Sequence, residues 1–128
     1  MPRSTVFAPD APEAVGPYSH AAFADGEVLL LSGQTPIDPA TGALVPGDFA
    51  AQARQVFANL SSVLEAAGLS FADVVKANVF LVDMADFARM NEIYATVFSA
   101  PFPARTTVAV AGLPLGARIE IELVALRG

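Results

Sequence analysis

The chain has 128 residues, a formal net charge of −6 and a hydrophobic share of 54%, which fits one domain, residues 1–128, with a core of its own. Because it contains no cysteine and one histidine, we expect no disulfide framework, no thiol nucleophile and no metal site built from those side chains. Its seven basic residues are scattered along the chain, so we also expect no nucleic-acid partner.

The amino-terminal segment has no apolar stretch of the length that a signal peptide needs. The longest aliphatic run, Val28–Leu31, is too short to cross a bilayer. We therefore expect a cytoplasmic protein without a membrane partner.

The first predicted strands occupy residues 19–24 and 27–32. They flank Asp25-Gly26, a dipeptide typical of two-residue hairpin turns, so the pattern predicts an antiparallel hairpin. Residues 35–47 contain three prolines and two glycines, which predicts a loop.

Two amphipathic helices are predicted next. Asp48 is suited to cap the first helix, whose apolar residues recur at helical spacing until Gly68. The second helix begins at Asp83 or Asp86 and ends before the prolines that follow it. Its apolar stripe consists of Phe87, Met90, Ile93, Tyr94, Val97 and Phe98.

Residues 74–82, 105–110 and 118–126 predict the remaining strands. The order of the elements indicates an α+β fold in which two helices cover one face of a β-sheet. Several of the strands are apolar on both faces, as in sheets that are buried on both sides. We therefore expect a second copy of the chain to cover the other face.

Four motifs are spread over the chain from about Ala14 onward: GPYSHAAFADG, LSGQTPIDPATGAL, FLVDMADFARMNEIYATVF and PFPARTTVAVAGLPLGARIEIELVAL. With these motifs the chain resembles the RidA family, also called the YjgF-like or L-PSP endoribonuclease family. The resemblance implies a mixed β-sheet with two helices on one face, in a chorismate-mutase-like architecture. It also implies a homotrimer whose sheets surround a central barrel.

Arg105 stands at the start of a predicted apolar strand, on the same face as Thr107 and Ala109. Two interpretations follow from the residues alone. Its guanidinium can bind the carboxylate of a small acid with two parallel hydrogen bonds, or it can form a cross-strand ion pair with Glu120 or Glu122. The resemblance favours the first, because PFPAR contains the family's substrate-carboxylate arginine.

Glu120 and Glu122 share one face of the last predicted strand. Two carboxylates at this spacing can divide acid and base catalysis, but on a half-exposed strand they can also be solvated side chains without a role. The resemblance assigns the orientation of a water molecule to Glu120. We expect Glu122 to be structural.

The resemblance adds Tyr18, Ser32, Gly33, Asn91 and Thr107 as substrate-binding residues. The first four also have a structural interpretation: a core aromatic for Tyr18, a strand end for Ser32 and Gly33, and a helix-to-loop hydrogen bond for Asn91. Thr107 stands where many family members have cysteine. We expect it to contribute mainly its backbone N–H.

The resemblance implies a deaminase that needs no cofactor and no metal and hydrolyses reactive 2-enamine or 2-imine acids to 2-keto acids and ammonia. Its partners would be these small carboxylic acids and further copies of itself. Two alternatives remain: a non-catalytic protein that binds 2-keto acids, and the ribonuclease or translation inhibitor that one family name suggests.

Overall fold

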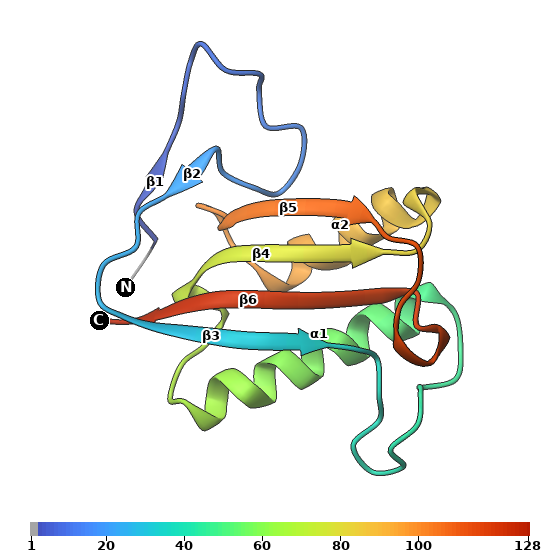
Figure 1. Ribbon diagram of the computed structural model, residues 1–128. Coiled ribbons are helices and arrows are strands. Elements are labelled where there is room, and N and C mark those ends of the chain that lie inside the picture. Colours follow the sequence, from blue (N-terminus) through green and yellow to red (C-terminus); the bar gives the residue numbers. More distant parts are fainter. Residues whose placement is uncertain (1–2) are drawn as a thin grey trace.

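The computed structural model describes residues 3–128. Its main sheet has four strands in the order β3-β6-β4-β5, seen face-on in Figure 1. These strands are β3 (Glu27–Gln34), β6 (Ile119–Arg127), β4 (Val74–Leu81) and β5 (Ala104–Ala109). β4 and β5 are parallel, whereas β6 is antiparallel to both β3 and β4. The predicted mixed sheet is confirmed.

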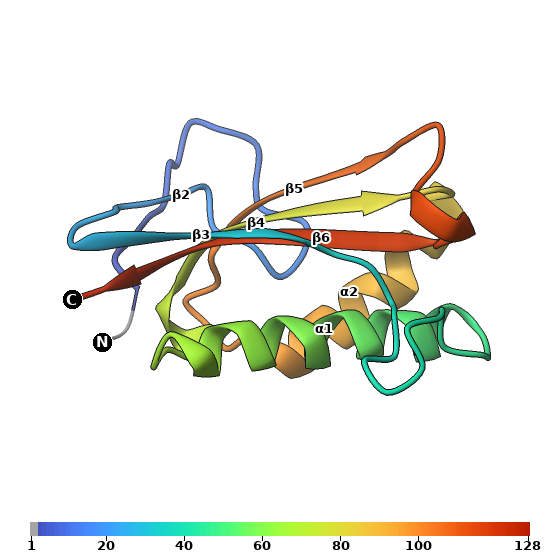
Figure 2. The ribbon, with the colours of Figure 1, turned by 60° about the horizontal axis from the view of Figure 1, so that its bottom comes forward.

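Both helices, α1 (Phe49–Ala66) and α2 (Phe87–Val97), lie on one face of the sheet (Figure 2). α2 forms the crossover that joins the parallel strands β4 and β5. The predicted α+β fold with two helices on one face is therefore confirmed. In the described part of the chain, no helix combines the length and the apolar character that a membrane crossing requires.

The ends of α1 are where the sequence places them. The Asp48 carboxylate accepts a hydrogen bond of 3.0 Å from the backbone N–H of Ala51, which satisfies one of the free donors of the first turn. At the other end Gly68 adopts a φ of 75°, and the Leu69 N–H donates to the Leu64 carbonyl at 2.9 Å. This pattern closes a helix and favours glycine at its left-handed position.

The two aspartates predicted as caps of α2 divide their roles. Asp83 caps a short 3₁₀ turn, Met84–Asp86, by accepting from the N–H of Ala85 at 2.9 Å. Asp86 directly precedes α2 but forms no capping bond. Both of its carboxylate oxygens accept instead from Arg118, at 2.9 and 3.0 Å.

The hairpin predicted across Asp25-Gly26 is wrong. β2 (Ala21–Ala22) pairs with β1 (Thr5–Val6) in a separate two-stranded sheet, and β3 pairs with β6. A Cβ added to Gly26 would lie 2.7 Å from the Arg127 carbonyl oxygen, so this glycine fits against the end of β6. β3 gains a longer partner in β6 and packs Leu29 and Leu31 against the core, which a hairpin with a short alanine-rich strand does not offer.

The core lies between the sheet and the helices. The sheet contributes Ala77, Val79, Leu81, Ile119, Ile121, Leu123 and Ala125 from one face. The opposite face has no helix over it in the described part of the chain (Figure 2). Val28 and Leu30 remain 51% and 74% exposed there. Apolar side chains exposed together on a sheet are typical of an interaction surface.

Arg3 connects the amino-terminal segment to the rest of the domain. Its guanidinium donates to the carbonyls of Phe71 at 2.7 Å, Val74 at 2.6 Å, Ser99 at 3.2 Å and Pro101 at 2.6 Å. These carbonyls belong to the segments that lead into β4 and follow α2. One side chain thus satisfies backbone groups of two separate connections.

We predict that Arg3→Ala lowers the free energy of unfolding by about 2 kcal/mol, because charge-assisted hydrogen bonds to carbonyls are lost. Urea denaturation at one fixed protein concentration measures this change. Arg89→Ala is the control, since the Arg89–Glu92 pair is 48% and 66% exposed and its loss changes stability by less than about 0.5 kcal/mol. Equal midpoints for both variants would contradict the role of Arg3.

Candidate functional site

The first group of predicted site residues lies at the β5 edge of the sheet. Arg105 is paired in register with Ala77 of β4, so its side chain lies on the helix-covered face. The guanidinium is half-buried there, and this burial lowers the pKa of Arg105, opposed by the nearby Tyr94 and Tyr18. An arginine keeps its charge in spite of such a shift.

Three aromatic rings surround the guanidinium. The Arg105 Cζ atom lies 4.9 Å from the ring centroid of Tyr94, 5.3 Å from that of Tyr18 and 5.7 Å from that of Phe87. Tyr94 and Phe87 belong to α2, and Tyr18 belongs to the segment that precedes β2. Aromatic faces attract a cation and exclude water from it, but they do not neutralise its charge.

Asn91 completes this arrangement. Arg105 Nη1 donates to Asn91 Oδ1 at 2.7 Å, and this is the one hydrogen bond from the guanidinium within residues 3–128. None of the ion pairs within that range includes Arg105. The interpretation of Arg105 as the partner of Glu120 or Glu122 is therefore wrong.

A half-buried cation without a counter-ion has lost part of its hydration and gained no opposite charge. The remaining N–H groups of Arg105 are free to donate in the plane of the guanidinium. That geometry matches the two oxygens of a carboxylate. The arrangement therefore has the chemistry of an anion site.

Two buried hydroxyl groups near this part of the fold have no hydrogen-bond partner among residues 3–128: Tyr94 Oη and Thr107 Oγ1. Thr107 follows Arg105 on the same face of β5, in register with Val79. Burial raises the pKa of the Tyr94 phenol, and Arg105 and Arg3 only partly oppose this, so the group stays neutral. Buried polar atoms normally have partners, and both hydroxyls retain unused hydrogen-bonding capacity.

The second group of predicted residues lies on the open face of the sheet. Glu120 alternates with the buried Ile119 and Ile121 and therefore points away from the helices. A Cβ added to Gly33 would collide with the Glu120 carboxylate, so these two residues are in close contact. Ser32 and Gly33 form a bulge in β3, since neither has a register partner in β6.

Glu122 has a structural partner, as expected. Asn78 Nδ2 on the adjacent strand β4 donates to Glu122 Oε1 at 3.1 Å. The predicted residues are thus divided between the two faces of the sheet. Arg105, Tyr18 and Asn91 meet on the helix side, with Thr107 on the same face of β5, whereas Glu120, Gly33 and Ser32 lie together around the bulge.

Three residues of the first group were not identified as site residues from the sequence. The apolar pattern of the sequence assigns Phe87 and Tyr94 only to the buried stripe of α2. Phe87, Asn91 and Tyr94 stand at positions i, i+4 and i+7, however, which places all three on one helix face. Gly16 borders Arg105 and Asn91 from the amino-terminal segment. The signal for it in the sequence was its place as the first residue of the motif GPYSHAAFADG, two residues before Tyr18.

His20 is structural in this arrangement. Its Nδ1 accepts from the Ala8 N–H at 2.9 Å, and Nε2 lies 2.7 Å from the Pro12 carbonyl oxygen, to which it donates. Its ring also stacks on Phe7, with a centroid distance of 5.5 Å. The histidine thus fixes the amino-terminal segment and is not directed at Arg105.

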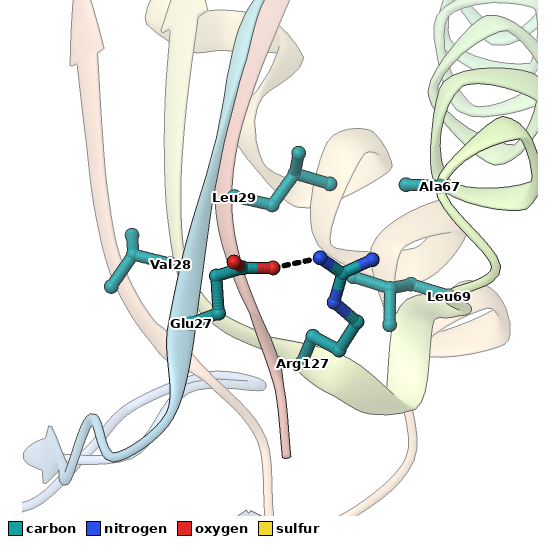
Figure 3. A pocket seen from close by; sticks show the side chains of 6 residues that line it. All are labelled: Glu27, Val28, Leu29, Ala67, Leu69 and Arg127. Atoms are coloured by element: carbon teal, nitrogen blue, oxygen red, sulfur yellow. Dashed lines mark hydrogen bonds and ion pairs between the residues drawn. The ribbon is translucent and has the colours of Figure 1, made fainter.

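A small cavity of about 70 Å³ lies between α1 and the ends of β3 and β6 (Figure 3). Its two charged residues, Glu27 and Arg127, form an ion pair with each other and are both largely exposed. Larger hollows of about 680 and 420 Å³ border Arg3, whose guanidinium is already bound to carbonyls. None of these three spaces offers an unpaired buried charge.

Known proteins resemble this chain over nearly all of its length. A family model described as Endoribonuclease L-PSP matches residues 8–127. Protein DfrA of Myxococcus xanthus is 48% identical to this chain, over 98% of this chain and 97% of that protein. The protein of Homo sapiens named 2-iminobutanoate/2-iminopropanoate deaminase is 46% identical, over 98% of this chain and 91% of its own.

Among solved structures, the crystal structure of RidA from the Antarctic bacterium Psychrobacter sp. PAMC 21119 superimposes with a TM-score of 0.76. It is 46% identical to this chain and covers 98% of it, and the match includes 100% of that structure's chain. The names of the relatives differ, so the comparisons by themselves do not name one substrate.

We predict that Asn91→Asp stabilises the protein and weakens its binding of pyruvate or 2-ketobutyrate by about tenfold or more. The new carboxylate keeps the bond to Arg105 and supplies the missing negative charge, so an acid ligand must compete with it. Asn91→Ala is the control, because it removes the bond without adding charge. Thermal unfolding and calorimetry measure both effects, and unchanged acid binding in the aspartate variant would exclude Arg105 as the anion site.

Proposed function

Because the chain belongs to the Endoribonuclease L-PSP family, as its motifs predicted, we propose that it is a deaminase of small 2-imino acids. It would act without a cofactor and release a 2-keto acid and ammonia. The observation that carries this proposal is the half-buried Arg105, which has three aromatic neighbours and no counter-ion within residues 3–128. Relatives named 2-iminobutanoate/2-iminopropanoate deaminase support it.

In the proposed complex Arg105 binds the carboxylate of the imino acid with two parallel hydrogen bonds. Tyr18 covers the bound acid with its ring, and the backbone N–H groups near Ser32 and Thr107 orient it. An acid held in this way has one orientation relative to the protein, so its imine carbon is presented at a constant position. The side chain of Asn91 holds the guanidinium itself in place.

Glu120 orients the attacking water and accepts its proton as the oxygen adds to the imine carbon. The imine nitrogen takes up a proton from the solvent, and the product of this step is a carbinolamine. Its C–N bond then breaks as the carbonyl forms and the hydroxyl proton returns to the solvent, and the proton held by Glu120 leaves with ammonia. Such general base catalysis contributes about 10²–10⁴-fold in rate.

The proposal includes a site that is shared between copies of the chain. Arg105 and Glu120 lie on opposite faces of the sheet, on strands that are separated by β4, so a single copy does not present both to one small acid. The exposed side chains of Val28, Leu30 and Val108 on the open face support burial against another copy. We propose a homotrimer in which the open faces surround a central barrel.

A non-catalytic protein that binds 2-keto acids is the second candidate. One observation favours it: the anion site around Arg105 is formed within one copy, whereas Glu120 is directed elsewhere. Binding that is equally strong before and during the reaction gives affinity without rate. Binding of 2-ketobutyrate by a protein that does not accelerate imine decay would identify this case.

The activity test couples a serine or threonine dehydratase to the purified protein and follows the decay of the imine. We predict that micromolar protein accelerates this decay. Arg105→Ala should abolish both turnover and 2-keto acid binding, and Arg105→Lys should fail as well because an ammonium cannot form the two parallel bonds. Full activity of the lysine variant would contradict the binding geometry, and no acceleration by the unmodified protein would contradict the deaminase proposal.

A subunit-mixing experiment tests the shared site. We predict that Arg105→Ala and Glu120→Gln are each inactive, and that coexpression of the two variants restores about a quarter of the activity. With random mixing, about one site in four combines an intact Arg105 from one copy with an intact Glu120 from its neighbour. Native mass spectrometry of the mixture verifies mixed trimers. If mixed trimers form and remain inactive, the two residues do not come from different copies.

A further inference from the structure

The segment Val15–Tyr18 passes directly over Arg105. A Cβ added to Gly16 would lie 3.4 Å from Arg105 Nη2 and 3.7 Å from Asn91 Nδ2. Neither nitrogen has a hydrogen-bond partner within residues 3–128. The space that a side chain at position 16 would occupy therefore borders two hydrogen-bond donors that have no partner in the described part of the chain.

The orientation of the Asn91 amide follows from its neighbour. A guanidinium has only donors, so the oxygen of the amide faces Arg105 Nη1, and the nitrogen is directed away from that bond. Asn91 Nδ2 and Arg105 Nη2 thus both border the position that a Cβ of residue 16 would occupy, at 3.7 and 3.4 Å. An acceptor atom that lies closer to the two nitrogens than this position can receive hydrogen bonds from both.

The position of Gly16 is held by local structure. The Tyr18 N–H donates to the Gly16 carbonyl at 2.8 Å, which forms a three-residue turn around Pro17. Next to the turn, the Ser19 N–H donates to the Pro103 carbonyl at 3.2 Å, which ties the segment to the start of β5. Gly16 is therefore held in a constant position relative to Arg105.

Backbone geometry gives no reason for a glycine here. Gly16 is not among the glycines with a positive φ, and the residue before a proline favours an extended conformation that any residue adopts. The contacts of an added Cβ would all be 3.4 Å or longer, which is ordinary van der Waals packing. The fold thus accepts alanine, and what the glycine provides is space beside the two donors.

We propose that Gly16 is a specificity-determining residue that keeps open an acceptor position between Arg105 Nη2 and Asn91 Nδ2. One carboxylate oxygen of the substrate occupies this position. This inference rests on the proposed function and deepens it, because it assigns the wall of the acid site to the amino-terminal segment. The site selects a planar carboxylate, because a carboxylate oxygen carries no proton and can accept hydrogen bonds from both donors.

A methyl group at Gly16 fills part of this space. We expect Gly16→Ala to weaken the binding of 2-ketobutyrate about tenfold or more, measured by calorimetry. We expect Gly16→Ser to weaken it further, because the hydroxyl oxygen accepts from Arg105 itself. In steady-state assays KM rises while kcat stays within about twofold, since the water and its base are untouched.

Gly112→Ala is the matched control. Gly112 also lacks a positive φ, and an added Cβ there would meet no atom within 4 Å. This variant should bind 2-ketobutyrate as the unmodified protein does, and all three variants should keep its melting temperature and oligomeric state. A Gly16→Ala protein that is folded and retains full affinity overturns the inference.

The outcomes also separate this inference from the proposed function. If Arg105→Ala abolishes acid binding and Gly16→Ala leaves it unchanged, the assignment of Gly16 is wrong and the acid site stands. If the unmodified protein binds neither pyruvate nor 2-ketobutyrate, the proposed function fails and the role of Gly16 fails with it. A rise in KM for the Gly16 variants alone, at constant kcat, supports both.

Discussion

One charge without a counter-ion in the described part of the chain determines how the site is built. Burial removes part of the hydration of Arg105, and the compensation comes from aromatic faces and one amide oxygen. These contacts hold the guanidinium in place, but they leave its net charge intact. The unpaired cation therefore retains its affinity for an anion in the folded state, and binding of a carboxylate would supply the missing charge.

The topology explains how distant parts of the chain reach this cation. β5 is an edge strand, so the amino-terminal segment has room to lie beside it (Figure 1). The parallel connection between β4 and β5 requires a crossover, and α2 in that crossover supplies Phe87, Asn91 and Tyr94 from one face. Arg3 and His20 fix the amino-terminal segment by hydrogen bonds to backbone groups.

Local signals predicted the fold well where local chemistry determines it. The limits of α1 follow from Asp48 and Gly68, whose roles depend on neighbours within one turn. The hairpin across Asp25-Gly26 failed because turn chemistry does not identify the partner of a strand, and β3 finds its partner at the far end of the chain. For the same reason alternation placed Glu120 and Glu122 on one face, but it could not relate that face to Arg105 without the strand order β6-β4-β5.

The separation of Arg105 from Glu120 follows a physical requirement. A carboxylate 4 Å from the guanidinium would interact with it by about 4 kcal/mol at an effective dielectric constant of 20. Such a pair within one copy would neutralise Arg105 and lower its affinity for a substrate carboxylate. Because the sheet lies between the two side chains, the cation stays unpaired within residues 3–128 of each copy. In the proposed assembly the bound acid lies between the arginine of one copy and the glutamate of another, so each charge acts on a different end of the substrate.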